Sequence, residues 1–156
     1  MGFFDRLRRV LPGRAPAGAF ARGSYELDRG RLDRAAAAFE IALAEADGAA
    51  QLAAVRNKRA IVAIRRGDRP AAVAELVLAL EAEPRSAAAI TTIGNLLLED
   101  GHVEDAMAHY ESALVADQDY APAYHNLGVA LHRAGRKSEA VRMLRKATKL
   151  ETRAKR

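Results

Sequence analysis

The chain has 156 residues and a net charge of +5, and it is 50% hydrophobic but only 5% aromatic. Alanine dominates its apolar residues, so helices are favoured and a sizeable sheet is excluded. It has no cysteine, which excludes disulfides, thiolate metal sites and cysteine nucleophiles.

Residues 1–15 form a segment of their own. On a helix predicted over residues 3–11, Phe3, Leu7 and Val10 share one face, and arginines lie mostly opposite. Pro12 and Gly13 end this helix and begin a linker. Three roles stay open: a cap on the domain that follows, an anchor on the anionic inner face of a membrane, or a partner contact.

The rest of the chain repeats itself. Four alanines, Ala35, Ala72, Ala106 and Ala140, recur at nearly constant spacing. Five residues before each lies a glycine, and four residues after each lies a large apolar side chain. A period of about 34 residues indicates a stack of similar supersecondary units.

Each unit has the pattern of a helix hairpin. Small residues allow two helices to approach closely, larger ones fill the same face a turn away, and the glycine ends the first helix. The sequence therefore predicts an all-α fold, an α-solenoid of antiparallel helix pairs with nearly fully buried alanines at positions 72, 106 and 140. The eight predicted helices span 16–29, 31–46, 50–66, 69–82, 86–100, 103–116, 120–134 and 137–152.

The pattern resembles the tetratricopeptide repeat, a helix hairpin of the same period. The last unit matches through Tyr124, Leu127, Gly128, Leu131, Ala140, Leu144 and Ala147. The resemblance implies one domain over residues 16–152, a basic tail at 153–156, and four copies at 16–49, 53–86, 87–120 and 121–152. Four charged residues depart from the pattern at expected core positions: Arg22, Glu26, Arg56 and Arg59.

For function, the resemblance implies a scaffold that holds a peptide or a partner helix in a concave groove. The first helix of each pair lines that groove, although Ile61, Ile64 and Leu98 are equally suited to packing against a neighbouring helix. Thr91 stands where relatives that grip a C-terminal carboxylate have lysine, so we do not expect that clamp. The predicted groove residues are Asn57, Ile61, Ile64, Arg65, Thr91, Asn95, Leu98, His125, Asn126, Val129, His132 and Arg133.

No catalytic pattern is present, and we expect neither an enzyme nor a bound cofactor or metal. His125 and His132 share a helix face, but no third ligand lies at a metal-binding spacing. The sequence contains no phosphate-binding, nucleophile-elbow or HExxH motif.

Charge and hydropathy complete the prediction. Residues 23–141 carry 13 basic and 18 acidic side chains, whereas both ends are basic, so nucleic-acid binding through the ends is a less favoured alternative. The last helix is expected to place Val141, Leu144 and Leu150 near the core, to leave Met143 and Ala147 uncovered, and to support weak self-association or partner docking. The alanine- and arginine-rich composition is typical of a GC-rich bacterial genome. No apolar run approaches the length of about 20 residues that spans a membrane, and no signal peptide is visible, so we expect a cytoplasmic protein.

Overall fold

The computed structural model describes residues 17–155, which form eight α-helices and contain no strand within that range. Each helix lies within three residues of its predicted bounds; the helix predicted at 3–11 lies outside the described residues. The helices are α2 (Ala19–Asp28), α3 (Leu32–Glu45), α4 (Ala49–Arg65), α5 (Arg69–Ala82), α6 (Ala87–Glu99), α7 (Val103–Ala116), α8 (Ala121–Arg133) and α9 (Lys137–Ala154).

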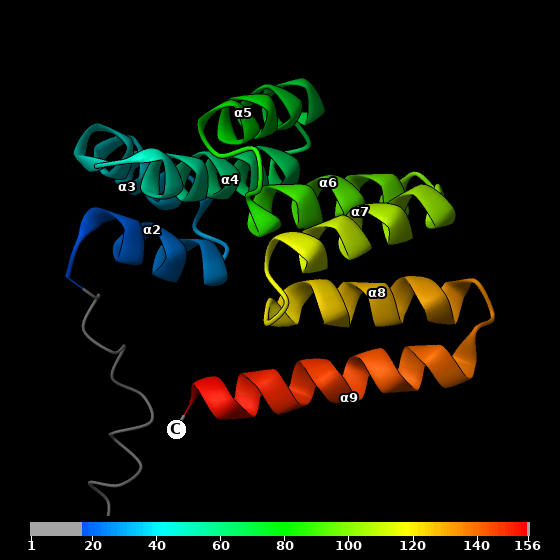
Figure 1. Cartoon of the computed structure of the whole chain (residues 1–156). Helices are drawn as coiled ribbons and strands as arrows, with labels where there is room; N and C mark the ends of the chain where they lie inside the picture. Colours follow the sequence, from blue (N-terminus) through cyan, green and yellow to red (C-terminus); the bar gives the residue numbers. More distant parts are fainter. Residues whose placement is uncertain (1–16, 156) are drawn as a thin grey trace, which may run out of the picture.

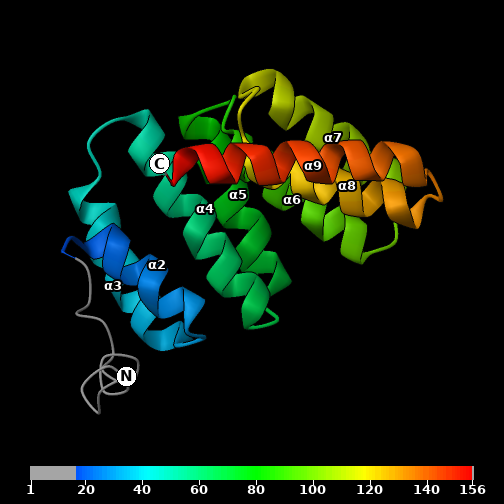
Figure 2. The same cartoon turned by 90° about the horizontal axis from the view of Figure 1, so that it is seen from below.

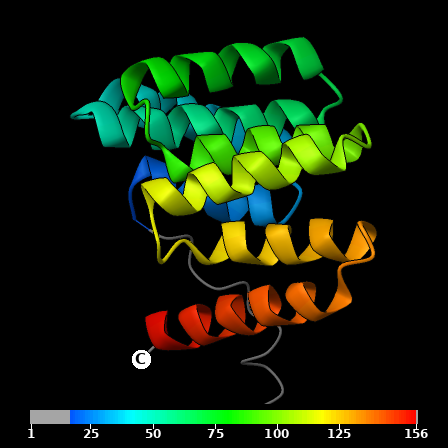
Figure 3. The same cartoon turned by 45° about the vertical axis from the view of Figure 1, so that its right-hand side comes forward.

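The helices form antiparallel pairs that stack into a curved solenoid (Figure 1). The first helices of the pairs, α2, α4, α6 and α8, border the inner side of the curve, and α3, α5 and α9 lie farther out. Viewed from below, α9 crosses in front of α8 at one end of the stack (Figure 2), and the rotated view shows the same order (Figure 3). No helix in the described range has both the length and the apolar character needed to cross a bilayer.

The turn inside each pair follows from its glycine. Gly67 has a φ of 76° and Gly101 a φ of 83°, left-handed conformations that a side chain would strain. The next residue then reaches back along the helix: the Asp68 N–H donates to the Ala63 carbonyl at 2.9 Å, as in a Schellman cap. Asp68 also caps the following helix by accepting from the Ala71 N–H at 3.0 Å. Two adjacent helix ends are thus satisfied within one short turn.

The three extra residues between the first two copies lengthen a helix. α4 has 17 residues, whereas α6 and α8 have 13 each. The additional turn lies at the start of α4, so the stack continues without a break.

Small residues of one helix face large residues of its partner in every pair. Ala72, Ala106 and Ala140 are at most 1% exposed, as predicted. A Cβ added to Gly94 would lie 2.6 Å from the Tyr110 ring, and one added to Gly128 would lie 2.8 Å from Leu144 Cγ. The second copy has Ala60 at the equivalent position, packed in one cluster with Leu76. Glycine thus faces an aromatic ring in the third copy, whereas the second copy shows that alanine and leucine can pack together.

This difference predicts unequal costs for two glycine substitutions. We expect Gly94→Ala to lower the free energy of unfolding by about 2 kcal/mol, because the added methyl collides with a buried ring. Gly128→Ala should cost less than about 1 kcal/mol, since Leu144 can adjust as Leu76 does beside Ala60 and since alanine favours the helix. Urea unfolding of both variants measures the difference. Equal costs would show that the identity of the facing side chain does not set the cost.

The charged residues at expected core positions of the second copy are accommodated by ion pairs. Arg56 donates to Glu75 at 3.0 Å, and Arg59 donates to Glu75 at 2.7 Å and also to Glu40. Burial opposes the charge of Arg59, but the hydrogen bonds to Glu75 and Glu40 outweigh it and raise its pKa. These four residues, the Arg–Glu network, join α3, α4 and α5.

The two charged residues at expected core positions of the first copy lie on α2 and differ in exposure, since the Glu26 side chain is only 15% exposed. Arg22 is exposed, and Glu26 forms an ion pair with Arg31 at 3.2 Å. Their counterparts in the fourth copy, Leu127 and Leu131, are buried against α7. No described helix precedes α2 in the way that α7 precedes α8, and polar side chains suit the face of α2 that such a helix would cover.

The contact between the second and third copies differs from the contact between the third and fourth. α7 packs extensively on α8, and its Met107 is buried, whereas α5 touches α6 less and leaves the equivalent Val73 48% exposed. Val77 and Leu78 extend this exposed apolar surface along α5.

Candidate functional site

The concave face is built by α4, α6 and α8, which pack side by side along the inner curve. The predicted groove residues differ in accessibility. Asn57, Thr91 and Leu98 are between 3% and 8% exposed and are part of the packing between helices. The remaining nine are at least partly accessible: Ile61, Ile64, Arg65, Asn95, His125, Asn126, Val129, His132 and Arg133.

A hydrogen-bonded cluster joins the third and fourth copies. The Oδ1 atom of Asn95 on α6 accepts from the Tyr110 hydroxyl at 2.9 Å and from Nδ2 of Asn126 on α8 at 2.8 Å. Burial raises the pKa of Tyr110 to about 12, nearby Arg133 lowers it, and Glu99 raises it further. The phenol therefore remains a donor at neutral pH. We call these three residues, Asn95, Tyr110 and Asn126, the Asn95 cluster.

The cluster fixes the orientation of both amides. With its oxygen occupied by two donors, Asn95 has its Nδ2 hydrogens free of any partner among residues 17–155. Asn126 donates from Nδ2, which leaves its Oδ1 free of any partner in the same range. The half-buried pair thus offers one donor group and one acceptor group on the concave face. A peptide group offers the complementary acceptor and donor.

Buried polar atoms without a partner lie along the same helices. Asn57 Oδ1 on α4 and Thr91 Oγ1 on α6 are buried, and neither atom makes a hydrogen bond within the described residues. Ser24 Oγ on α2 is in the same condition. Buried polar atoms without a partner in the described range thus occur on the inner helices of three successive copies, which is unusual for a packing core.

The ends of the inner helices carry alternating charges. Asp28, Arg65, Glu99 and Arg133 are the last residues of α2, α4, α6 and α8. Each arginine donates to a carbonyl near the end of the preceding inner helix: Arg65 to Leu27 at 2.5 Å and Arg133 to Leu98 at 3.0 Å. A cation at a helix C-terminus offsets the negative end of the helix dipole. The first and second copies, and the third and fourth, are therefore joined in the same way.

A different contact joins the second and third copies. Arg69, at the start of α5, donates to the Leu96 carbonyl at 3.2 Å and pairs with Asp100. Ile64, Leu96 and Glu99 border a hollow of about 240 Å³ beside it. This hollow lies where α4 and α6 meet, next to the accessible groove residue Ile64.

No group of three or more histidine, aspartate and glutamate side chains in residues 17–155 could hold a metal ion. His125 and His132 are exposed on α8. The concave face presents amide groups, aliphatic side chains and charges of alternating sign.

Family models match the same copies. A model described as a TPR repeat matches residues 94–135, and two described as tetratricopeptide repeats match residues 53–77 and 122–150. The chain belongs to the tetratricopeptide repeat family. No curated protein sequence matches this tetratricopeptide repeat protein.

Solved structures share the solenoid at low sequence identity. The crystal structure of MamA is 19% identical over 98% of this chain and 88% of that one, with a TM-score of 0.60. YrrB, a TPR protein with an unusual peptide-binding site, is 21% identical over 86% of this chain and 68% of that one, with a TM-score of 0.56. BtubC from P. vanneervenii is 21% identical over 88% of this chain and 63% of that one, with a TM-score of 0.62. At these identities the likeness establishes the fold.

The family pattern does not distinguish which groove residues are accessible, nor does it indicate the Asn95 cluster. Tyr110 is expected from the sequence as a core residue, and its ring is buried. Its hydroxyl nonetheless reaches Asn95 on the neighbouring helix. The tyrosine hydroxyl could have indicated this hydrogen bond from the sequence, because the hydroxyl of a buried tyrosine needs a partner.

Proposed function

We propose that this tetratricopeptide repeat protein is an interaction scaffold that holds an extended peptide segment of a partner on the concave face of its third and fourth copies. The observation that carries the proposal is the Asn95 cluster. Asn95 donates to a peptide carbonyl, and Asn126 accepts from a peptide N–H, so the two amides recognise main chain regardless of the partner's side chains.

The surroundings of the cluster define what else the peptide contacts. His125 and His132 are exposed on α8, and Val129 between them is partly accessible. Glu99 and Arg133 contribute charges of opposite sign beside the cluster. A surface of this kind suits a peptide with small apolar side chains and little net charge. The peptide-binding site of YrrB, on the same fold, supports this use of the solenoid.

A displayed library of random peptides, selected on the full chain, tests this function. Asn126→Ala removes the free acceptor, and we expect it to weaken the selected peptides about tenfold, the effect of about 1.4 kcal/mol. Gln118→Ala is the matched control, because Gln118 is an exposed amide in the turn before α8. Circular dichroism melting shows whether each variant remains folded.

The opposite pattern would refute the proposal. If selected peptides bind Asn126→Ala as tightly as the unchanged chain while the variant melts normally, the cluster does not hold main chain.

A further inference from the structure

The outer side of α9 is a second surface with the features of a binding site. α9 is the last described helix along the chain, and no other described helix lies beyond it in Figures 1 and 3. An open strip of surface runs along it and is lined by residues of α9 alone. We call the strip formed by Val141, Leu144, Arg145, Thr148 and Lys149 the outer face of α9.

The structure corrects the sequence prediction of which residues this helix leaves uncovered. Ala147 is 2% exposed, and Met143 packs against the core cluster that contains Leu131. Val141, expected near the core, is 45% exposed instead. Compared with the prediction, α9 is rotated about its axis, so that Val141 faces solvent and Ala147 faces the core.

The outer face has an apolar centre. The Thr148 hydroxyl donates to the Leu144 carbonyl at 3.1 Å, and the Thr152 hydroxyl donates to the Thr148 carbonyl at 2.8 Å. These hydroxyl hydrogens are used within the helix, which reduces the polarity of the strip. Together with Val141 and the accessible edge of Leu144, whose other side packs against Gly128 of α8, the threonines form a stripe along one side of α9.

The same molecule shows what such a face binds. Val141 and Thr148 lie one repeat period after Met107 and Leu114 of α7. There, Met107 lies in one cluster with Leu127 and Leu131 of α8, and Leu114 packs against that cluster. The equivalent face of α7 is therefore occupied by a helix that contributes leucines four residues apart. α9 presents this face with no described helix against it.

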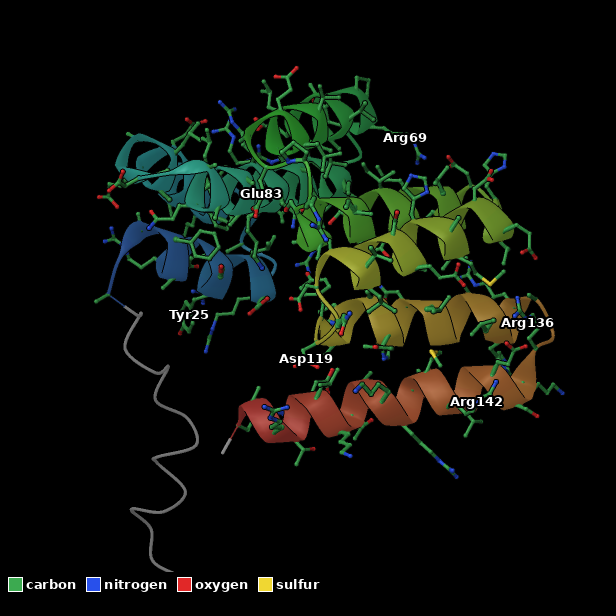
Figure 4. All side chains as sticks on the ribbon, viewed as in Figure 1. Tyr25, Arg69, Glu83, Asp119, Arg136 and Arg142 are labelled. Atoms are coloured by element: carbon green, nitrogen blue, oxygen red, sulfur yellow. The ribbon has the colours of Figure 1, made fainter. Side chains whose placement is uncertain are left out.

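The charge of α9 selects the chemistry of the occupant. α9 contains six basic and two acidic residues, and of the latter Glu139 is paired with Arg136 at 2.7 Å. Arg145, Lys149 and Arg153 have no acidic partner within the described residues. Figure 4 shows side chains projecting from α9 on the side away from α8, with Arg136 at the turn that precedes it. An occupant with carboxylates beside its apolar seam would complement these cations.

We propose that the outer face of α9 binds an amphipathic helix of a partner protein, with leucine-like residues on Val141, Leu144 and Thr148 and acidic residues against Arg145, Lys149 and Arg153. This surface is separate from the concave face and independent of the peptide-binding proposal. A second copy of this chain is a poorer fit, because the exposed apolar face of α5 offers only one exposed carboxylate on that helix, Glu81.

A stapled helical peptide that keeps the spacing of Leu127 and Leu131, with glutamates beside the leucines, is the probe. Its binding to the full chain is followed by fluorescence anisotropy at low and high salt. We expect saturable binding that weakens at high salt, and a loss of about tenfold when glutamine replaces glutamate in the peptide. Val141→Asp in the chain should cause a similar loss. Val77→Asp should change the affinity less than about twofold, since Val77 is equally exposed on α5.

Each other outcome overturns the proposal. If the glutamine peptide binds as tightly as the glutamate peptide, charge has no role in the binding. If Val141→Asp leaves the affinity unchanged, the peptide does not bind at the outer face of α9. Concentration-dependent sedimentation of the chain alone that Val141→Asp abolishes assigns the face to a second copy. Displacement of the peptide by duplex DNA or by phosphatidylserine vesicles assigns the cations to a nucleic acid or a membrane. Asn126→Ala should not affect peptide binding here, which keeps this test distinct from that of the concave face.

Discussion

Replacing Glu75 with alanine should lower the free energy of unfolding by about 3 kcal/mol, because two partly buried cations lose their shared partner. Glu75 is the acceptor of both Arg56 and Arg59, at 3.0 and 2.7 Å, and its side chain is only 14% exposed. Both arginine side chains are only 23% exposed; after the substitution Arg59 keeps its ion pair with Glu40, whereas Arg56 has no other acidic partner among the described residues. Removal of one partner from a buried pair costs about 3–5 kcal/mol, and partial exposure reduces this figure.

Urea unfolding measures the cost, with Glu81→Ala as the control. Glu81 lies on the same helix but is exposed and forms no ion pair within the described residues, so its loss should cost less than about 0.5 kcal/mol. A second variant provides the rescue. Arg56→Tyr, Arg59→Leu and Glu75→Met together recreate the equivalent residues of the fourth copy, and most of the lost stability should return. If Glu75→Ala is as mild as Glu81→Ala, the network contributes nothing to folding.

The second large effect concerns the small residues between paired helices. Ala106→Leu should cost about 3 kcal/mol, because Ala106 is fully buried and a longer side chain would push α6 and α7 apart. Ala108→Leu is the matched control, since Ala108 lies on the same helix and is exposed. It should change stability by less than about 0.5 kcal/mol. Thermal or urea unfolding of both variants decides the matter, and a neutral Ala106→Leu would place the residue outside a close contact.

The repeating spacing predicts most of the fold because it encodes packing. Ala72, Ala106 and Ala140 occur where two helices touch, and only a small side chain allows that approach at every copy. Glycines such as Gly67 occur where the chain must reverse in a left-handed conformation. These requirements are local and periodic, so helix bounds follow from the sequence within three residues.

The candidate site is harder to predict because it depends on how far neighbouring copies turn relative to one another. Asn57, Thr91 and Leu98 have groove positions yet are buried between helices. The rotation of one copy relative to the next decides which groove residues become buried. That rotation depends on contacts between copies, which the repeat period in the sequence does not predict. The same holds for Val141 and Met143 on α9, whose exposures are the reverse of those expected.

The Arg–Glu network and the Asn95 cluster show a further limit. Arg59 and Glu75 are 16 residues apart, and Asn95 and Asn126 are 31 apart, so neither partner identifies the other along the chain. Their polar character at core or groove positions is visible in the sequence. Their pairing requires the three-dimensional placement of α3 to α8.

Site-specific photo-crosslinking of a library-selected peptide tests most directly whether the concave face of the third and fourth copies is the binding surface. A photoreactive residue replaces His125 on the concave side of α8 in one variant and Val115, which is 72% exposed at the end of α7, in the other. We predict that the peptide crosslinks to the variant at position 125 and not to the variant at position 115. Crosslinking at position 115 with none at position 125 would contradict a concave binding site.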